Sequence, residues 1–231
     1  MKLKIAICFF SLVLLWGCRQ DRISISGTIT NCNASYLPLM QILPNEVVDM
    51  DTVLLLNGSF SHRIKSQQVG VYLLKISDDV FLSFIASAGD KLVFSGDAKD
   101  NLLKNYDVQG NEETKLIIES RRKLDEVYQQ TKQLSKEFIR HTYNENLDSL
   151  KIIDSVYTTL FEAHKDYLTH FIRSNPDKLA SLMAFYQTLG QNAFFSVKED
   201  RELLKMIYFS LSKKYPNSLY VNDLGEKLEE K

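Results

Sequence analysis

The sequence lacks an excess of charge of either sign, and it contains few cysteines and prolines. Its 231 residues include 28 basic and 29 acidic side chains, which leaves no broad positive field for attracting nucleic acid or anionic lipid. Three cysteines are too few for a fold held together by disulfides. The hydrophobic fraction of 45% is sufficient for a packed core and excludes an intrinsically disordered chain. The composition therefore predicts an ordinary globular protein that does not bind nucleic acid.

The motifs of common catalytic and cofactor sites are also absent. The chain contains no Cys-x-x-Cys pair, no Gly-x-Ser-x-Gly sequence and no phosphate-binding glycine loop. Two of its four histidines, His164 and His170, are six residues apart, so on a helix they face different sides. The other two, His62 and His141, are isolated in the sequence. We expect no catalytic residue, no metal site and no cofactor.

The N-terminus has the pattern of a secretory signal. Lys2 and Lys4 precede an apolar run from Ile5 to Leu15, which is shorter than the roughly 20 residues of a membrane-spanning helix. The run ends in Leu14-Leu15-Trp16-Gly17-Cys18, and polar residues follow at once. This sequence resembles the bacterial lipobox, in which the signal is cleaved before the cysteine and the cysteine receives lipid. An ordinary signal peptide with a chance cysteine is the alternative.

The lipobox resemblance implies a signal peptide over residues 1–17 and a lipid-anchored linker over residues 18–22. Two or three acyl chains on Cys18 would anchor the protein stably in a membrane. Arg19 is not the aspartate that retains lipoproteins in the inner membrane of some bacteria. We therefore expect a cell-envelope protein in the outer membrane that faces the periplasm.

Signal cleavage and lipidation leave Cys32 as the only free thiol. Cys8 would leave with the signal peptide, and Cys18 would carry the lipid, so no intramolecular disulfide is expected. The neighbours of Cys32, residues 30–34, supply no group that lowers the pKa of a thiol. We expect this cysteine to be inert.

Composition changes near residue 110, because most glycines precede it and most charged residues follow it. We assign a β domain to residues 23–110 and a helical domain to residues 111–231. The alternation of apolar and polar residues from Ile23 to Ile29 predicts a strand with one buried face, and Asn57-Gly58 predicts a hairpin turn. Further strands are expected at Tyr36–Ile42, Val47–Leu56, Ser59–Lys65, Val69–Ile76, Val80–Ala86 and Lys91–Ser95. These short strands predict an antiparallel β-sandwich or an open barrel.

Amphipathic periodicity predicts helices in the second half. A short polar link, Thr142–Asn146, joins the first two, so they should form a long antiparallel helical hairpin with a coiled-coil-like seam. Asn217 or Ser218 is the expected cap of the last helix. The predicted helices are Glu112–His141, Leu147–Ile172, Lys178–Leu189, Lys198–Lys214 and a final helix that ends near Glu229. The fold class expected from both halves is α+β.

Two groups of side chains invite a functional interpretation. Asp49 and Asp51 alternate with apolar residues and would share the solvent face of a strand, where an acid-base or cation-binding role is possible but a solvated face is the simpler reading. Aromatic residues cluster in the last three helices, and aromatic side chains are enriched at protein interfaces. Core packing is the simpler explanation for this cluster. The sharper prediction is a partner surface formed by Phe194, Phe195, Tyr208 and Phe209.

Several short motifs carry a family resemblance. They are Gly27-Thr28-Ile29, the sequence from Ser87-Ala88-Gly89-Asp90-Lys91-Leu92 to Phe94-Ser95-Gly96-Asp97, Tyr106-Asp107-Val108-Gln109-Gly110, Ser174-Asn175-Pro176 and Lys214-Tyr215-Pro216-Asn217-Ser218. Together they resemble the N-terminal domain of unknown function, and the helical segment after it, of Bacteroidetes-type thioredoxin-like lipoproteins of the disulfide-reductase class. The resemblance covers most of the chain after the signal.

The sequence departs from that family in having no Cys-x-x-Cys pair, which performs the thiol-disulfide exchange of the reductases. The resemblance therefore implies no catalytic residue for this chain. We expect a non-enzymatic lipoprotein that serves as a binding or scaffolding module, with an envelope protein as partner and the membrane contacted through the lipid. The alternative is an accessory or degenerate component of the envelope thiol-disulfide system that acts with a separate thioredoxin-like protein.

Overall fold

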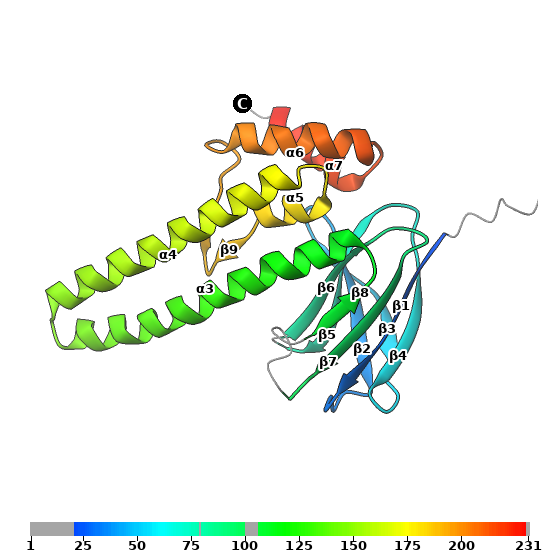
Figure 1. The fold of residues 1–231 in the computed structure, drawn as a ribbon, viewed down its shortest axis with the longest axis horizontal. Coiled ribbons are helices and arrows are strands. Elements are labelled where there is room, and N and C mark those ends of the chain that lie inside the picture. The colour runs from blue at the N-terminus through cyan, green and yellow to red at the C-terminus, as the bar shows by residue number, and fades with distance from the viewer. Residues whose placement is uncertain (1–20, 79, 100–105, 230–231) are drawn as a thin grey trace, which may run out of the picture.

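The computed structural model describes residues 21–78, 80–99 and 106–229 (Figure 1). Strands dominate the first half of this part and helices the second, which confirms the α+β class. The strands before the first described helix are β1 (Arg22–Thr30), β2 (Tyr36–Ile42), β3 (Val47–Leu54), β4 (Ser59–Lys65), β5 (Gly70–Ser77), β6 (Val80–Ala86), β7 (Lys91–Asp97) and β8 (Asp107–Gln109). The later elements are α3 (Glu112–Tyr143), α4 (Leu147–Ser174), α5 (Leu179–Phe185), β9 (Thr188–Leu189), β10 (Asn192–Ala193), α6 (Arg201–Lys214) and α7 (Leu219–Glu229).

The first eight strands form two four-stranded sheets. Their strand orders are β4-β1-β7-β8 and β3-β2-β5-β6. Neighbouring strands are antiparallel except β1 and β7, which are parallel. The purely antiparallel arrangement expected from the sequence is wrong for this pair, because strand partners far apart in the chain leave no local sequence signal. The described strands do not close into a barrel.

The period-two pattern of β1 has the predicted structural effect. Ile23 and Ile25 are buried, whereas Ser24 and Ser26, which alternate with them, are only partly covered. The sheets meet through their apolar faces, since the ring of Phe84 on β6 contacts the ring of Phe94 on β7 with centroids 5.5 Å apart. The apolar faces of both sheets thus share one core.

The predicted turn at Asn57-Gly58 is confirmed. Asn57 and Gly58 have φ angles of 50° and 77°, the positive values that this type of hairpin turn requires. Most strand predictions agree with the structure to within two residues. The short strand β8 was not predicted, because three residues are too few for a periodic signal.

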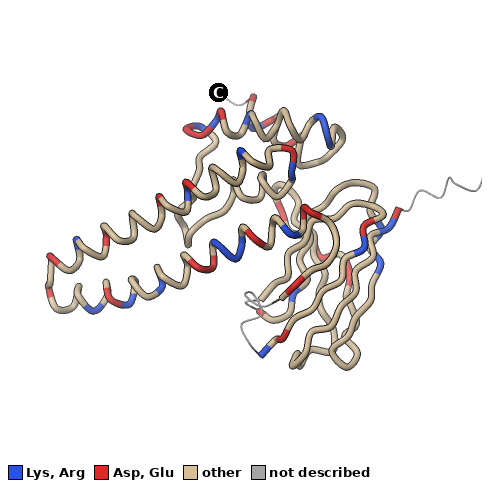
Figure 2. The backbone as a smooth tube through the Cα atoms, viewed as in Figure 1, with Lys and Arg blue, Asp and Glu red and all other residues tan. Residues whose placement is uncertain are grey.

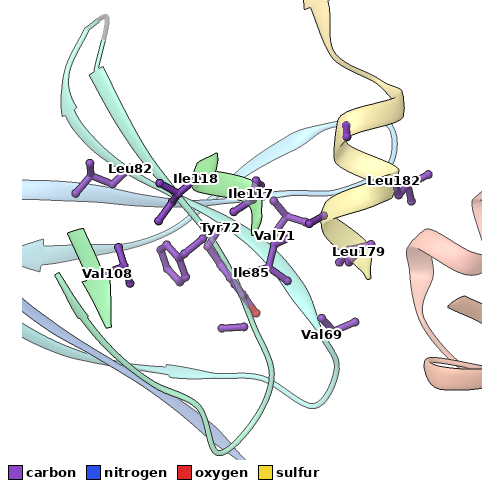
Figure 3. Packing of buried hydrophobic residues seen from close by; sticks show 14 of the residues in the cluster. Val69, Val71, Tyr72, Leu82, Ile85, Val108, Ile117, Ile118, Leu179 and Leu182 are labelled. Atoms are coloured by element: carbon purple, nitrogen blue, oxygen red, sulfur yellow. The ribbon is translucent and has the colours of Figure 1, made fainter. Parts of the chain in front are cut away.

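Helices cover the outer face of the β5–β6 pair. Neighbouring residues of β5 such as Val71 and Tyr72 are both buried, which means that this strand is covered on both faces. Figure 3 shows Ile117 of α3 gathered with Val71 and Ile85, and Leu179 of α5 beside them. The β strands and the helices therefore share one hydrophobic cluster.

The long helices α3 and α4 lie side by side and project away from the sheets (Figure 1). The side chain of Asn111 accepts a hydrogen bond from the N–H of Thr114 at 2.8 Å and caps the start of α3. Asn146 caps α4 in the same way through the N–H of Ser149. Only residues 144–146 separate the two helices.

The later elements differ from the sequence prediction in two places. The helix expected at Lys178–Leu189 ends at Phe185, and the β9–β10 ribbon follows it around Gly190, whose φ is 63°. The helix expected from Lys198 begins at Arg201. Before it, the side chains of Ser196 and Asp200 bond to backbone N–H groups within residues 196–200 and hold a turn. Local side-chain hydrogen bonding thus replaces the first helical turn.

Candidate functional site

A cleft of about 450 Å³ lies where the β strands meet the last helices. Three turns form it: residues 67–69 between β4 and β5, residues 87–89 between β6 and β7, and residues 215–218 between α6 and α7. Its lining residues are Gln67, Gln68, Val69, Ser87, Ala88, Gly89, Tyr215, Pro216, Asn217 and Ser218. None of them is a histidine, cysteine, carboxylate or cation, so the lining is polar but uncharged.

The turn between β6 and β7 is fixed by a carboxylate. Asp90 Oδ2 accepts hydrogen bonds from the N–H of Ser87 at 2.8 Å and from Asn111 Nδ2 at 2.6 Å. Gly89 has a φ of 96° and donates its N–H to the carbonyl of Arg22 at 2.9 Å. These hydrogen bonds tie the turn both to the start of α3 and to β1. The side of the cleft that this turn forms is therefore fixed before any ligand binds.

The turn between α6 and α7 is tied to α3 through Glu113. Tyr215 donates its phenol hydrogen to Glu113 Oε1 at 3.0 Å, and Lys214 Nζ donates to the same oxygen at 3.3 Å. The other oxygen accepts the N–H of Ala180 at 3.2 Å. Burial, and next the negative charge of Glu113, raise the pKa of Tyr215, so the phenol stays protonated and acts as a donor.

Three side-chain amides in the cleft remain open to a ligand. The side-chain amides of Gln67, Gln68 and Asn217 form no hydrogen bond with any described residue. The Oγ atom of Ser218 is buried and has no partner within the described part. Ser218 occupies the predicted cap position before α7, and its backbone carbonyl accepts the N–H groups of Val221 and Asn222, but its side chain makes no capping hydrogen bond.

The predicted aromatic partner surface is wrong for two of its four residues. Phe194 and Phe195 are only 2% and 6% exposed. Phe194 stacks on Phe161 of α4 at 4.6 Å, because the β9–β10 ribbon directs the following residues toward the helices. Tyr208 is half-buried, and Phe209 is 60% exposed. The four side chains therefore do not form one exposed patch.

The acidic pair on β3 does not form a shared site. A β-bulge at Met50 places Asp49 opposite Met40 and Asp51 opposite Leu39. Asp51 Oδ2 lies 3.2 Å from His62 Nε2 on β4, a strand of the other sheet. Asp51 is therefore occupied in a pair with His62, which the sequence alone did not indicate.

The remaining histidines and cysteines do not gather either. His164 is buried, its Nε2 lies 3.3 Å from Gln187 Oε1, and burial lowers the pKa of its imidazole despite that contact. Within the described ranges, no group of three or more histidine, cysteine or acidic side chains is arranged to hold a metal ion. Cys32 is a half-buried free thiol, and Cys18 lies outside the described residues. No described helix is both long and apolar enough to span a membrane.

Comparisons with protein-family models, with curated proteins and with solved structures found no match to this chain. The resemblance to thioredoxin-like lipoproteins therefore stays a prediction. Two of its motifs, Ser87–Leu92 and Lys214–Ser218, contribute residues to the cleft although they lie far apart in the sequence. They were the only sequence signal that pointed to this place, and nothing in the sequence indicated that they meet.

Proposed function

We propose that this chain is a non-enzymatic lipoprotein of the bacterial cell envelope, anchored by lipid on Cys18, and that its described part is a binding module. The cleft between the three turns carries the proposal. Its walls are held by Asp90 and Glu113, and its open amides have no partner in the described chain. A preformed cleft with unused hydrogen-bonding groups is typical of a ligand site.

The lining favours an uncharged, hydroxyl-rich ligand, and a neutral oligosaccharide fits this chemistry best. Amide side chains such as those of Gln68 and Asn217 both donate and accept hydrogen bonds, as sugar hydroxyls do. Tyr215 and Pro216 add apolar surface for the carbon face of a ring. A charged ligand would find no opposite charge in the lining and would lose hydration on binding.

The finer architecture is part of the same proposal. We interpret the two sheets as a β-sandwich and α3 with α4 as an antiparallel helical hairpin. The contact between Phe84 and Phe94 across the sheets supports the first interpretation, and the three-residue link between the helices supports the second. In this arrangement the sandwich and the last helices together form the part of the molecule that contains the cleft, and the hairpin projects from it.

The anchor is tested by fractionating cells that express the full chain with a lipid label. We expect the native chain in the membrane fraction with label on it, whereas Cys18→Ser should lose the label and leave the membrane. Cys32→Ser is the matched control and should behave like the native chain. A native chain that carries no label would contradict the anchor.

Ligand binding is tested by calorimetry on the full chain in detergent. The probes are maltohexaose, cellohexaose and chitohexaose, with the acidic hexamer of galacturonate for comparison. We expect at least one neutral probe to bind and the acidic one not to bind. Combined Gln68→Ala and Asn217→Ala should weaken that binding about tenfold or more, which corresponds to the loss of roughly one to two hydrogen bonds.

The control for this experiment is Gln133→Ala on α3, which removes an exposed amide outside the cleft. Absence of binding by all three neutral probes, or equal binding by the double variant, would contradict the oligosaccharide site. A thioredoxin-like protein recovered with the native chain from membranes, together with an altered thiol state of envelope proteins in its absence, would instead support the accessory role in thiol-disulfide exchange.

A further inference from the structure

The outer parts of α3 and α4 are unusually exposed. Thr131 is the last buried residue along α3, and His164 is the first along α4. Every residue from 132 to 163 is described, and none of them is buried. We call residues 132–143 of α3 and 147–163 of α4 the outer segments. A pair of helices this long normally buries its apolar face against a further element.

The outer segments expose large apolar side chains to solvent. Phe138 and Ile139 on α3 are 46% and 56% exposed, and Ile152 and Val156 on α4 are 64% and 41% exposed. A cavity of about 290 Å³ lies between the helices at this level. Its lining includes Leu134, Phe138, Ile139, Ile153 and Tyr157. An apolar groove whose lining includes the exposed side chains of Phe138 and Ile139 is typical of an interface.

Another part of the chain, the β9–β10 ribbon, covers only the end of this groove that lies nearer the β sheets. Asn192 of the β9–β10 ribbon donates its side-chain N–H to the Tyr157 hydroxyl at 2.8 Å. Leu189 of the same ribbon lines a separate cavity with Tyr128 of α3. From Tyr157 toward the helix turn, no described element covers the groove (Figure 1).

The two outer segments carry opposite charges. The outer segment of α3 has three cations, Lys132, Lys136 and Arg140, and one carboxylate. The outer segment of α4 has three carboxylates, Asp148, Asp154 and Glu162, and one cation. Figure 2 shows blue predominating on outer α3 and red on outer α4. Lys132, Lys136, Asp154 and Glu162 form no ion pair with a described residue.

We infer that the outer segments form an interface between two copies of this chain, with α3 of each copy lying on α4 of the other. In a two-fold arrangement the same patch contacts itself, so a surface with one basic and one acidic helix is complementary to its own copy. A partner of uniform charge would be attracted by one helix and repelled by the other. Two such helix pairs together make a four-helix bundle, which buries the groove residues in its centre.

The association is tested by sedimentation equilibrium of the full chain in density-matched detergent. We expect a dimer for the native chain. Ile139→Glu places a charge in the centre of the interface and should raise the dimer dissociation constant about tenfold or more. The matched control is Phe209→Glu, which charges an exposed aromatic residue on α6 and should leave the dimer intact. Circular dichroism should show that both variants keep the helical content of the native chain.

A charge-reversal series distinguishes this interface from any other apolar association. Combined Lys132→Glu and Lys136→Glu should weaken the dimer, because both outer helices are then acidic. Adding Asp154→Lys and Glu162→Lys to the same chain should restore it. A monomeric native chain, a dimer unaffected by Ile139→Glu, or a charge reversal without restoration would each overturn the inference. The sedimentation and charge-reversal experiments do not depend on whether the cleft binds the proposed ligand.

Discussion

The phenol of Tyr215 donates a hydrogen bond of 3.0 Å to the buried carboxylate of Glu113, which lies 102 positions earlier in the chain. This contact joins the turn between α6 and α7 to the first turn of α3. Because the same carboxylate also accepts the N–H of Ala180, one side chain connects three helical segments. The position of the wall of the cleft at residues 215–218 depends on it.

Removal of the Tyr215 hydroxyl should destabilise the fold. Tyr215→Phe deletes one donor to Glu113 and leaves a buried carboxylate with fewer partners, so we expect a loss of about 1 to 3 kcal/mol in the free energy of unfolding. Urea denaturation measures it. Tyr36→Phe is the control, because Tyr36 is exposed and should give no change. Equal stability of the two variants would show that the contact contributes nothing.

The Thr114 hydroxyl forms hydrogen bonds with the backbone of the edge strand β6, so its removal should lower the stability of the protein. Its Oγ1 donates to the carbonyl of Ile85 at 2.7 Å and accepts the N–H of the same residue at 3.2 Å. Thr114→Val keeps the shape but leaves the N–H of Ile85 unpaired and its carbonyl with only the hydrogen bond from Asn111 Nδ2, so we expect a loss of about 1 to 3 kcal/mol in unfolding free energy. The exposed Thr158→Val should change it little. A tolerated Thr114→Val would mean that water or a shifted backbone replaces the hydroxyl.

Gly27 allows β1 and β7 to approach closely. A Cβ atom at this position would lie 2.3 Å from the carbonyl oxygen of Phe94, which is part of the backbone and cannot rotate away. Gly27→Ala should therefore destabilise the protein by about 1 to 3 kcal/mol. Gly225→Ala on α7 meets only the ring of Tyr208, at 3.3 Å, and helix propensity favours alanine there, so thermal melting should show little loss. Similar melting shifts would contradict the steric argument.

Burial of His164 should make stability depend on acid. Because burial lowers the pKa of this imidazole in the folded protein, the unfolded chain takes up a proton first as the pH falls below about 6.5. The stability that the neutral side chain provides is complete above that pH and is lost as the pH decreases. His164→Asn should reduce the difference in unfolding free energy between pH 7.5 and pH 5.5. The exposed His170→Asn should keep the native difference.

Local patterns were enough to predict most strands and the long helices. The alternation of apolar and polar residues predicted β1. The turn at Asn57-Gly58 was recognised from its residues, because only a few residue types tolerate positive φ. The β-bulge at Met50 and the parallel pairing of β1 with β7 were missed, because both depend on a partner strand that the local sequence does not contain.

The candidate site was harder to predict than the fold. Aromatic clustering suggested Phe194 and Phe195 as exposed, yet both fill space beside α4 and α5. The cleft is assembled from three turns that are distant in sequence, and the unpaired state of Gln68 or Asn217 is visible only once their neighbours are known. Sequence periodicity identifies elements, whereas a cleft between elements is a property of their packing.

The position of β1 within its sheet has a mechanical consequence. In a chain held by its N-terminus, any pull between the membrane and a bound partner enters the fold at Arg22, the first residue of β1. This strand is bonded on one side to β4 and on the other to β7, so the tension acts along two ladders at once. An edge strand has only one such ladder, so β1 is held by more hydrogen bonds than an edge strand of the same length would be. If lipid on Cys18 anchors the chain as proposed, the strand nearest the anchor is one that its sheet holds on both sides.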